Sequence, residues 1–160
     1  QQAVAENTAG LCSSALGQYI FGALAHESHQ QLKQWYDQQR AYYAGMLNHF
    51  TETTRRLLPG VIVSSPDAAI YSAIDVRDIA KPGFNALQFV LWCAQNGSVE
   101  MDGQKMTLLT APMSGFYSVE KGQPNPGDTQ MRVAYVETPE RMKLVPQLLA
   151  ELFKAYESSR

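Results

Sequence analysis

The chain has 160 residues, of which 45% are hydrophobic and 18% charged, with a formal net charge of −2 at pH 7. This length suits one ordinary domain, the hydrophobic fraction excludes a disordered tail, and the near-neutral charge argues against a general nucleic-acid-binding protein. No apolar run approaches about 18 residues and the amino end lacks a signal-peptide pattern, so we expect a cytoplasmic protein with no membrane partner, in which Cys12 and Cys93 are reduced thiols.

Two helices are predicted in the first third of the chain. Small and apolar residues at helical spacing predict the first helix over residues 13–25. Ser28 is then a typical N-cap, Gln31 completes a capping box, and the helix that follows ends at Pro59-Gly60. The steps of three and four along this second helix predict one buried face, which comprises Leu32, Trp35, Tyr36, Gln39, Tyr43, Met46, Leu47 and Phe50.

The middle of the chain predicts two strands and a helix. Residues 61–63 and 70–76 have the composition and alternation of strands, and a helix is expected over residues 85–95. Asn96-Gly97 is expected to end that helix in a left-handed conformation. The predicted buried face of the helix comprises Leu87, Val90, Leu91 and Ala94.

The last third continues the alternation of strands and helices. Asp102-Gly103 is a hairpin signal, and residues 131–136 predict a strand. Thr138-Pro139-Glu140 is a strong helix start, and Pro146 is expected to kink the helix that follows or to split it into two. The order of elements, without repeats or a low-complexity linker, indicates one α+β unit.

Several side chains that could carry chemistry lie in patterns that do not favour it. His26 and His29 are three residues apart, whereas a zinc-binding helix needs histidines four apart, so we expect solvated side chains and no metal site. Ser114 lacks the glycine pattern of an exposed nucleophile. Asp75 and Asp78 could form a carboxylate pair, but strand ends carry such residues routinely.

Arg132 is the candidate binding residue. It lies in mid-strand between Met131 and Val133, where a charged side chain costs desolvation unless an anion pairs with it. Small Ala134 on the same face leaves room for the planar guanidinium to meet a carboxylate through two parallel hydrogen bonds. The residue pattern leaves two interpretations open, an edge strand with a solvent-facing arginine or a carboxylate-binding site.

Segments spread over nearly the whole chain resemble the carboxy-terminal part of fold-type I, PLP-dependent aminotransferases of the aspartate aminotransferase group. Ser65-Pro66-Asp67-Ala68-Ala69-Ile70-Tyr71 resembles that family's Pro-x-Gly-Ala-Phe-Tyr turn, with Ala68 and Ile70 where Gly and Phe are usual. Thr110-Ala111-Pro112-Met113-Ser114-Gly115-Phe116-Tyr117 is similar to its Ala-Pro-x-x-Gly-Phe-Tyr loop. Gln130-Met131-Arg132-Val133-Ala134-Tyr135-Val136 is similar to its Val-Arg-Ile-Ala-Tyr-Val strand. Residues 11–18 resemble the segment that leads out of the large domain, and the final helix also fits.

The resemblance implies a fold and a role for Arg132. It implies that residues 1–28 form a connecting segment from a large domain and residues 29–160 a small domain, α+β with a small mixed sheet and helices packed on one side. In the family, the arginine on the matching strand binds the substrate α-carboxylate, so Arg132 is expected to do so here, near the loops 110–117 and 122–128.

The resemblance also implies which residues are missing from the chain. None of the six lysines has the sequence context of the family's Schiff-base lysine. The chain opens with Gln1 rather than Met, which indicates a piece of a longer protein. We therefore expect no catalytic and no cofactor-binding residue here, and no pyridoxal 5'-phosphate bound to this chain alone.

The expected full-length protein is an aminotransferase that uses pyridoxal phosphate. It would transfer an amino group between an amino acid and a 2-oxo acid, with aspartate suggested by the resemblance, and homodimers are usual in the family. Two alternatives stay open, namely the effector domain of an aminotransferase-like transcription regulator and a ligand-binding module without catalysis.

Overall fold

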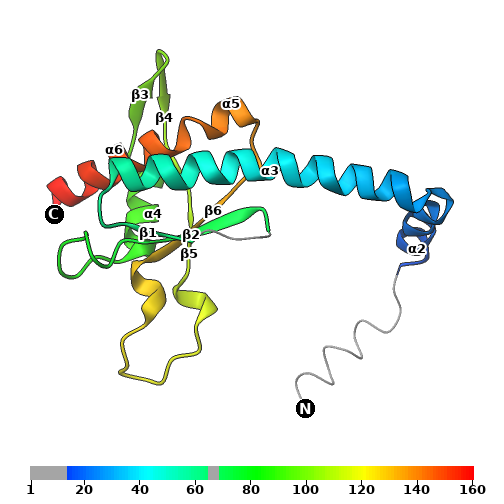
Figure 1. The fold of residues 1–160 in the computed structure, drawn as a ribbon. Coiled ribbons are helices and arrows are strands. Elements are labelled where there is room, and N and C mark those ends of the chain that lie inside the picture. Colours follow the sequence, from blue (N-terminus) through cyan, green and yellow to red (C-terminus); the bar gives the residue numbers. More distant parts are fainter. Residues whose placement is uncertain (1–13, 65–68) are drawn as a thin grey trace. The chain divides into compact units, whose positions relative to one another are not determined.

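A computed structural model describes residues 14–64 and 69–160 of the chain (Figure 1). The chain divides into two compact units, Gln1–Ala41 and Tyr42–Arg160, and the division falls inside one long helix. The division into a connecting segment (residues 1–28) and a small domain (residues 29–160) stays a prediction from the sequence. None of the helices in the described ranges is both long and apolar enough to cross a lipid bilayer.

The described part of the first unit, residues 14–41, is helical, and its helix starts follow from capping residues. It contains α2 (Ala15–Gly22), the 3-10 helix η1 (Ala23–His26) and the first turns of α3 (His29–Leu57). The predicted capping box is confirmed, because the Gln31 N–H donates to Ser28 Oγ at 3.2 Å and the Ser28 N–H donates to Gln31 Oε1 at 2.9 Å.

The predicted core stripe of α3 is confirmed only over its second half. Met46, Leu47 and Phe50 are buried, but Trp35 and Tyr36 are 53% and 54% exposed. Helical spacing places these side chains on one face, and the spacing says nothing of whether another element covers that face.

The second unit is built around a small antiparallel sheet, and the α+β class is confirmed. The sheet order is β1-β2-β6-β5, and a separate hairpin pairs β3 with β4. Every pairing in the described ranges is antiparallel, which corrects the expectation of a mixed sheet. A loop without a crossover helix joins β5 to β6, and such a connection reverses the chain and makes neighbouring strands antiparallel. The strands are β1 (Ile62–Val63), β2 (Tyr71–Asp75), β3 (Val99–Met101), β4 (Gln104–Met106), β5 (Ala111–Pro112) and β6 (Gln130–Ala134).

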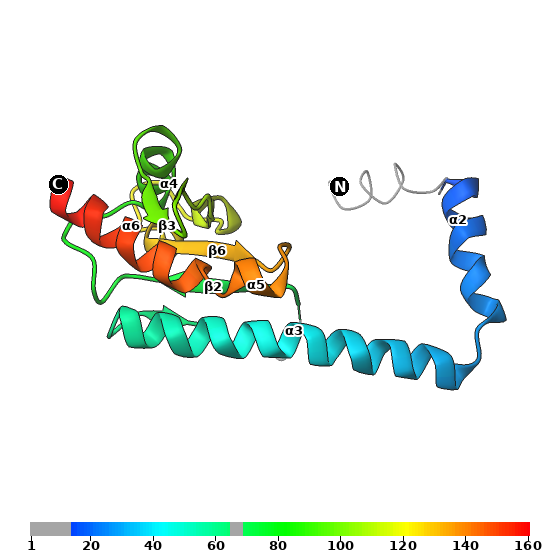
Figure 2. The same cartoon turned by 90° about the horizontal axis from the view of Figure 1, so that it is seen from above.

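One face of the sheet packs against helices. Figures 1 and 2 show the second half of α3 together with α6 (Val145–Ser159) on the same side of β2 and β6. The core joins fully buried side chains of all four elements, namely Phe50, Ile74, Met131, Leu149 and Leu152. The short helix α5 (Pro139–Met142) precedes α6, so the predicted split before Pro146 is confirmed.

The helix α4 (Ala86–Gln95) lies against β5 and α6, and its predicted buried face is wrong. Phe89 and Cys93 are buried, while Leu87 and Leu91 are 44% and 43% exposed. Apolar residues occur around most of this helix, so spacing cannot select a face. The contact of Phe89 with the rings of Phe84, Phe153 and Tyr156 selects it.

The two predicted turns have different outcomes. Asp102 and Gly103 have φ angles of 51° and 72°, which confirms the hairpin between β3 and β4. Asn96 has a φ of −133°, so the predicted left-handed end of α4 is wrong. Glycine is required at position 97 because the backbone passes close to α4, and a Cβ at this position would lie 2.8 Å from the Cys93 Cα.

Candidate functional site

Arg132 lies at the centre of the sheet, on the face opposite to the helices. Met131 and Val133 are buried in the core, and the alternation of β6 directs Arg132 to the other side. β6 has β2 on one side and β5 on the other, so the interpretation of an edge strand is wrong. The residues paired with Arg132 are Ala73 and Ala111, whose small side chains leave space on both sides of it.

Two aromatic rings hold the guanidinium of Arg132. Its Cζ atom lies 4.7 Å from the ring centroid of Tyr71 on β2 and 5.0 Å from that of Phe116. Within residues 14–64 and 69–160, Arg132 has no ion pair and no hydrogen-bond partner. The rings stabilise the charge without occupying the N–H groups, so a planar fork of donors is available to a ligand anion.

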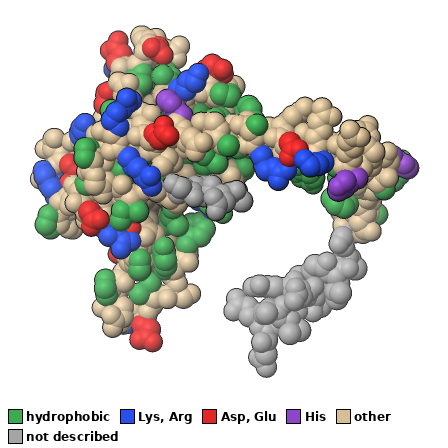
Figure 3. All heavy atoms as spheres, in the orientation of Figure 1, with side chains coloured by type: hydrophobic (Ala, Val, Ile, Leu, Met, Phe, Trp, Pro, Cys, Tyr) green, Lys and Arg blue, Asp and Glu red, His purple; other side chains and the backbone are tan. Residues whose placement is uncertain are grey.

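Phe116 belongs to the predicted loop 110–117, and a second loop supports it. It ends the 3-10 helix η2 (Ser114–Phe116), which contacts η3 (Pro126–Thr129) of the other predicted loop. The Asn125 amide nitrogen donates to the Ser114 carbonyl at 2.9 Å. Figure 3 shows hydrophobic side chains gathered over the loop between β5 and β6, where Phe116, Tyr117 and Val119 are exposed.

Asp75 organises polar groups next to this site, at the end of β2. Asp75 is 5% exposed, and its carboxylate accepts hydrogen bonds from Thr129 Oγ1 and Gln130 Nε2, both at 2.8 Å, and from Arg77. Burial alone would raise the pKa of Asp75, but the hydrogen bonds from Arg77, Gln130 and Thr129 outweigh it and hold that pKa below its usual value. These partners explain Asp75 without the carboxylate pair that Asp78 could have formed.

Sequence reasoning from the residues did not single out Tyr71, Phe116 and Gln130. Tyr71 and Phe116 lie inside the segments that carry the family resemblance, and Gln130 begins the strand of Arg132. A usable signal was the alternation of β2 and β6, because Tyr71 and Gln130 fall on the same face as Ala73 and Arg132.

The other candidate side chains offer no convergent chemistry. His26 and His29 are exposed, and the described residues hold no group of three or more His, Cys, Asp or Glu side chains that could bind a metal ion. Burial raises the pKa of the Cys93 thiol to about 11, which disfavours a nucleophilic thiolate. Cys12 lies outside the described residues.

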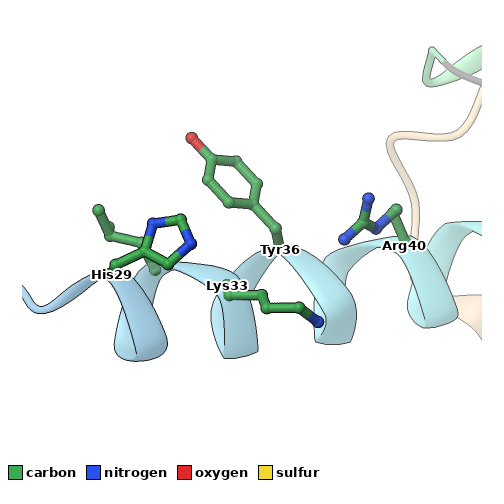
Figure 4. Close-up of a pocket in the computed structure, with 5 residues that line it drawn as sticks. His29, Lys33, Tyr36 and Arg40 are labelled. Atoms are coloured by element: carbon green, nitrogen blue, oxygen red, sulfur yellow. The ribbon is translucent and has the colours of Figure 1, made fainter.

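A hollow of about 290 Å³ lies beside the first turns of α3 (Figure 4). Its walls are side chains from successive turns of this one helix, and Lys33 and Arg40 are both ion-paired with Asp37. Both cations of the hollow therefore already share one anionic partner, and none of the residues that line the hollow contacts Arg132 in the structure. The lining residues are His29, Leu32, Lys33, Tyr36 and Arg40.

The lysines of this chain do not fit a Schiff-base site for pyridoxal phosphate. All six are exposed, Lys33 is paired with Asp37, and the Lys81 ammonium donates to the Glu157 carbonyl. A lysine that reacts with an aldehyde cofactor is typically desolvated, whereas these six side chains are open to solvent. The cofactor chemistry of an aminotransferase is therefore not assigned to residues of this chain.

Comparisons with known proteins give structural relatives only. No protein-family model and no curated protein sequence matches the chain. The crystal structure of kynurenine aminotransferase from Pyrococcus horikoshii, in complex with PMP, is similar over 96% of this chain and 33% of its own, at 14% identity and a TM-score of 0.66. The α-aminoadipate aminotransferase of Thermus thermophilus, complexed with N-(5'-phosphopyridoxyl)-L-leucine, matches 88% of this chain and 31% of its own, at 12% identity and a TM-score of 0.60.

A third similar structure is an archaeal alanine:glyoxylate aminotransferase, at 16% identity and a TM-score of 0.54. It covers 72% of this chain and 24% of its own. The chain thus spans about a quarter to a third of the length of the enzymes that it matches. The chain therefore has an aminotransferase-like domain fold, which it shares with a minor part of each of these aminotransferases.

Proposed function

We propose that the chain is the carboxy-terminal small domain of a PLP-dependent aminotransferase and that Arg132 binds the α-carboxylate of its substrate. The observation that carries this proposal is an arginine in the middle of a sheet whose guanidinium lies over two aromatic rings and has no anionic partner among the described residues. An arginine so placed costs desolvation, and a ligand carboxylate would offset that cost. The aminotransferase-like fold supports the choice of this reaction class.

Arg132 would act by binding and orientation. A bidentate contact fixes both the position and the plane of a carboxylate, which aligns the Cα of an amino acid relative to the rest of an active site. The rings of Tyr71 and Phe116 restrict the guanidinium, so less side-chain entropy is lost on binding. The alanines that pair with Arg132 leave space for the ligand beside it.

The proposal extends to the domains, the substrates and the oligomeric state of the full-length protein. Residues 1–28 would connect to a large domain that holds pyridoxal phosphate, and residues 29–160 would form the small domain. The substrates would be an amino acid, with aspartate as the first candidate, and a 2-oxo acid, and the full-length enzyme would be a homodimer.

Titration of the chain with 2-oxoglutarate tests the role of Arg132. In the ¹⁵N-labelled protein, we expect the Arg132 Nε–Hε signal to shift on addition of the 2-oxo acid. Arg132→Gln should weaken binding by at least about tenfold, because it removes a charged bidentate contact. Arg56→Gln is the matched control, since Arg56 is exposed on α3. Equal affinity of the wild type and Arg132→Gln would refute the assignment.

The reaction class is tested by the transamination kinetics of the protein that carries this chain. In the protein that carries this chain, Arg132→Gln should raise KM for the amino acid and lower kcat, because the carboxylate also orients the reacting carbon. Carboxylate binding at Arg132 without transamination in that protein would instead favour an effector domain or a ligand-binding module.

A further inference from the structure

The ring of Phe116 needs an anchor that its own packing does not supply. Phe116 ends a three-residue 3-10 helix and is 61% exposed, so few neighbours restrict its side chain. Its ring centroid nevertheless lies 5.0 Å from the Arg132 Cζ, which is a stacking distance. Because the side chain is exposed, the position of the ring depends on how the backbone of η2 is held.

The next residue, Tyr117, is tied to the sheet. Its hydroxyl donates to Gln130 Oε1 at 2.5 Å, and Gln130 Nε2 donates to Asp75 Oδ2 at 2.8 Å. The buried Asp75 carboxylate is itself fixed by Thr129 and Arg77. We call this series of contacts the Tyr117–Gln130–Asp75 hydrogen-bond chain. It runs from the loop through β6 to β2.

The strand register explains how this chain of bonds reaches Phe116. Gln130 and Arg132 lie two residues apart on β6, on the same face and about 6.8 Å apart. Asp75 pairs with Gln130, as Ala73 pairs with Arg132. Tyr117 and Phe116 are adjacent in sequence, so fixing Tyr117 at the level of Gln130 holds Phe116 at the level of Arg132.

We propose that the Tyr117–Gln130–Asp75 hydrogen-bond chain positions Phe116 against the Arg132 guanidinium and thereby sets the affinity of Arg132 for a carboxylate. Tyr117 and Gln130 are positioning residues that act through Phe116. The effect on carboxylate affinity rests on the proposed function of Arg132. The positioning of the Phe116 ring does not.

Tyr117→Phe tests the proposal, because it removes one hydroxyl and keeps the ring. In the ligand-free protein, the rings of Tyr71 and Phe116 should shift the Arg132 Nε–Hε signal upfield, and Tyr117→Phe should reduce this ring-current shift. The affinity for 2-oxoglutarate should fall by about three- to tenfold, the range expected for one net hydrogen bond. Tyr42→Phe is the matched control, since Tyr42 is 46% exposed and its hydroxyl has no hydrogen-bond partner in the described ranges.

A second variant checks the same contact from its other side. Gln130→Met keeps the length of the side chain and removes both of its hydrogen bonds, so it should also reduce the ring-current shift. The two changes should not be additive in the double variant, because each breaks the same Tyr117–Gln130 bond.

The outcomes separate the two proposals. An unchanged ring-current shift in Tyr117→Phe and Gln130→Met overturns the positioning role, whether or not Arg132 binds a carboxylate. A reduced shift with unchanged affinity in a binding-competent protein overturns the link to affinity. A reduced shift in a protein that does not bind 2-oxoglutarate supports the positioning of the ring and counts against the proposed function.

Discussion

Gly127 is expected to be intolerant of even a methyl group. It is buried in η3, where the backbone passes directly over the loop that carries η2. A Cβ built on Gly127 would lie 2.5 Å from the Met113 carbonyl oxygen and 2.6 Å from the Ser114 Cα. Both contacts are to backbone atoms, so no side-chain rotation can relieve them, and the two loops must separate in Gly127→Ala.

The expected cost follows from overpacking in a buried site. Inserting a methyl into such a site typically costs about 1–3 kcal/mol in the free energy of unfolding. With a urea m-value of about 2 kcal/mol/M, the midpoint of unfolding should fall by about 0.5–1.5 M. Urea titration followed by circular dichroism measures this shift.

Gly115→Ala is the matched control, one loop away. A Cβ at Gly115 meets no atom within 4 Å, and Gly115 is not among the residues of positive φ. Replacing such a glycine stabilises a protein by about 0.4–1 kcal/mol through the unfolded chain. The two variants should therefore shift the midpoint in opposite directions. A Gly127→Ala midpoint equal to or above that of Gly115→Ala would refute the steric reasoning.

Three further predictions concern buried polar groups. Tyr135→Phe should lower the free energy of unfolding by about 1–3 kcal/mol, because the hydroxyls of Tyr135 and Ser72 lie 2.9 Å apart in the core and Ser72 would lose its partner. The double variant with Ser72→Ala should recover part of this loss in the same urea titration, and a further loss would contradict it. The raised pKa of Cys93, about 11 against an ordinary 9.0, predicts that stability falls as the pH rises from about 9 to 11. Cys93→Ala should flatten this alkaline slope in thermal melts. The lowered pKa of Asp75 predicts stability that is present above pH 3.8 and is lost as the pH falls below it. In Asp75→Asn, the free energy of unfolding should no longer fall in this acid range. If the fall were unchanged, other carboxylates would be its cause.

Local signals in the sequence were sufficient for helix and turn positions. The capping box at Ser28 and the Asp102-Gly103 turn act through contacts within a few residues, so each is visible in a short window. The same holds for the division before Pro146, because a proline lacks the N–H that a helix interior needs.

Burial could not be predicted in the same way. α4 is apolar around most of its surface, and only its contacts with Phe84, Phe153 and Tyr156 decide that Phe89 faces inward. The first half of the α3 stripe has the spacing of a buried face, yet Trp35 and Tyr36 are exposed.

The sequence by itself determined the α+β class, the approximate positions of the main elements and the candidacy of Arg132, because these depend on local spacing and on the desolvation cost of one charge in an apolar strand. Only the tertiary structure decided that β6 is a central strand and that the rings of Tyr71 and Phe116 meet over Arg132. The reason is physical. Strand order and cross-strand register bring together residues about 60 positions apart, and no local pattern specifies them.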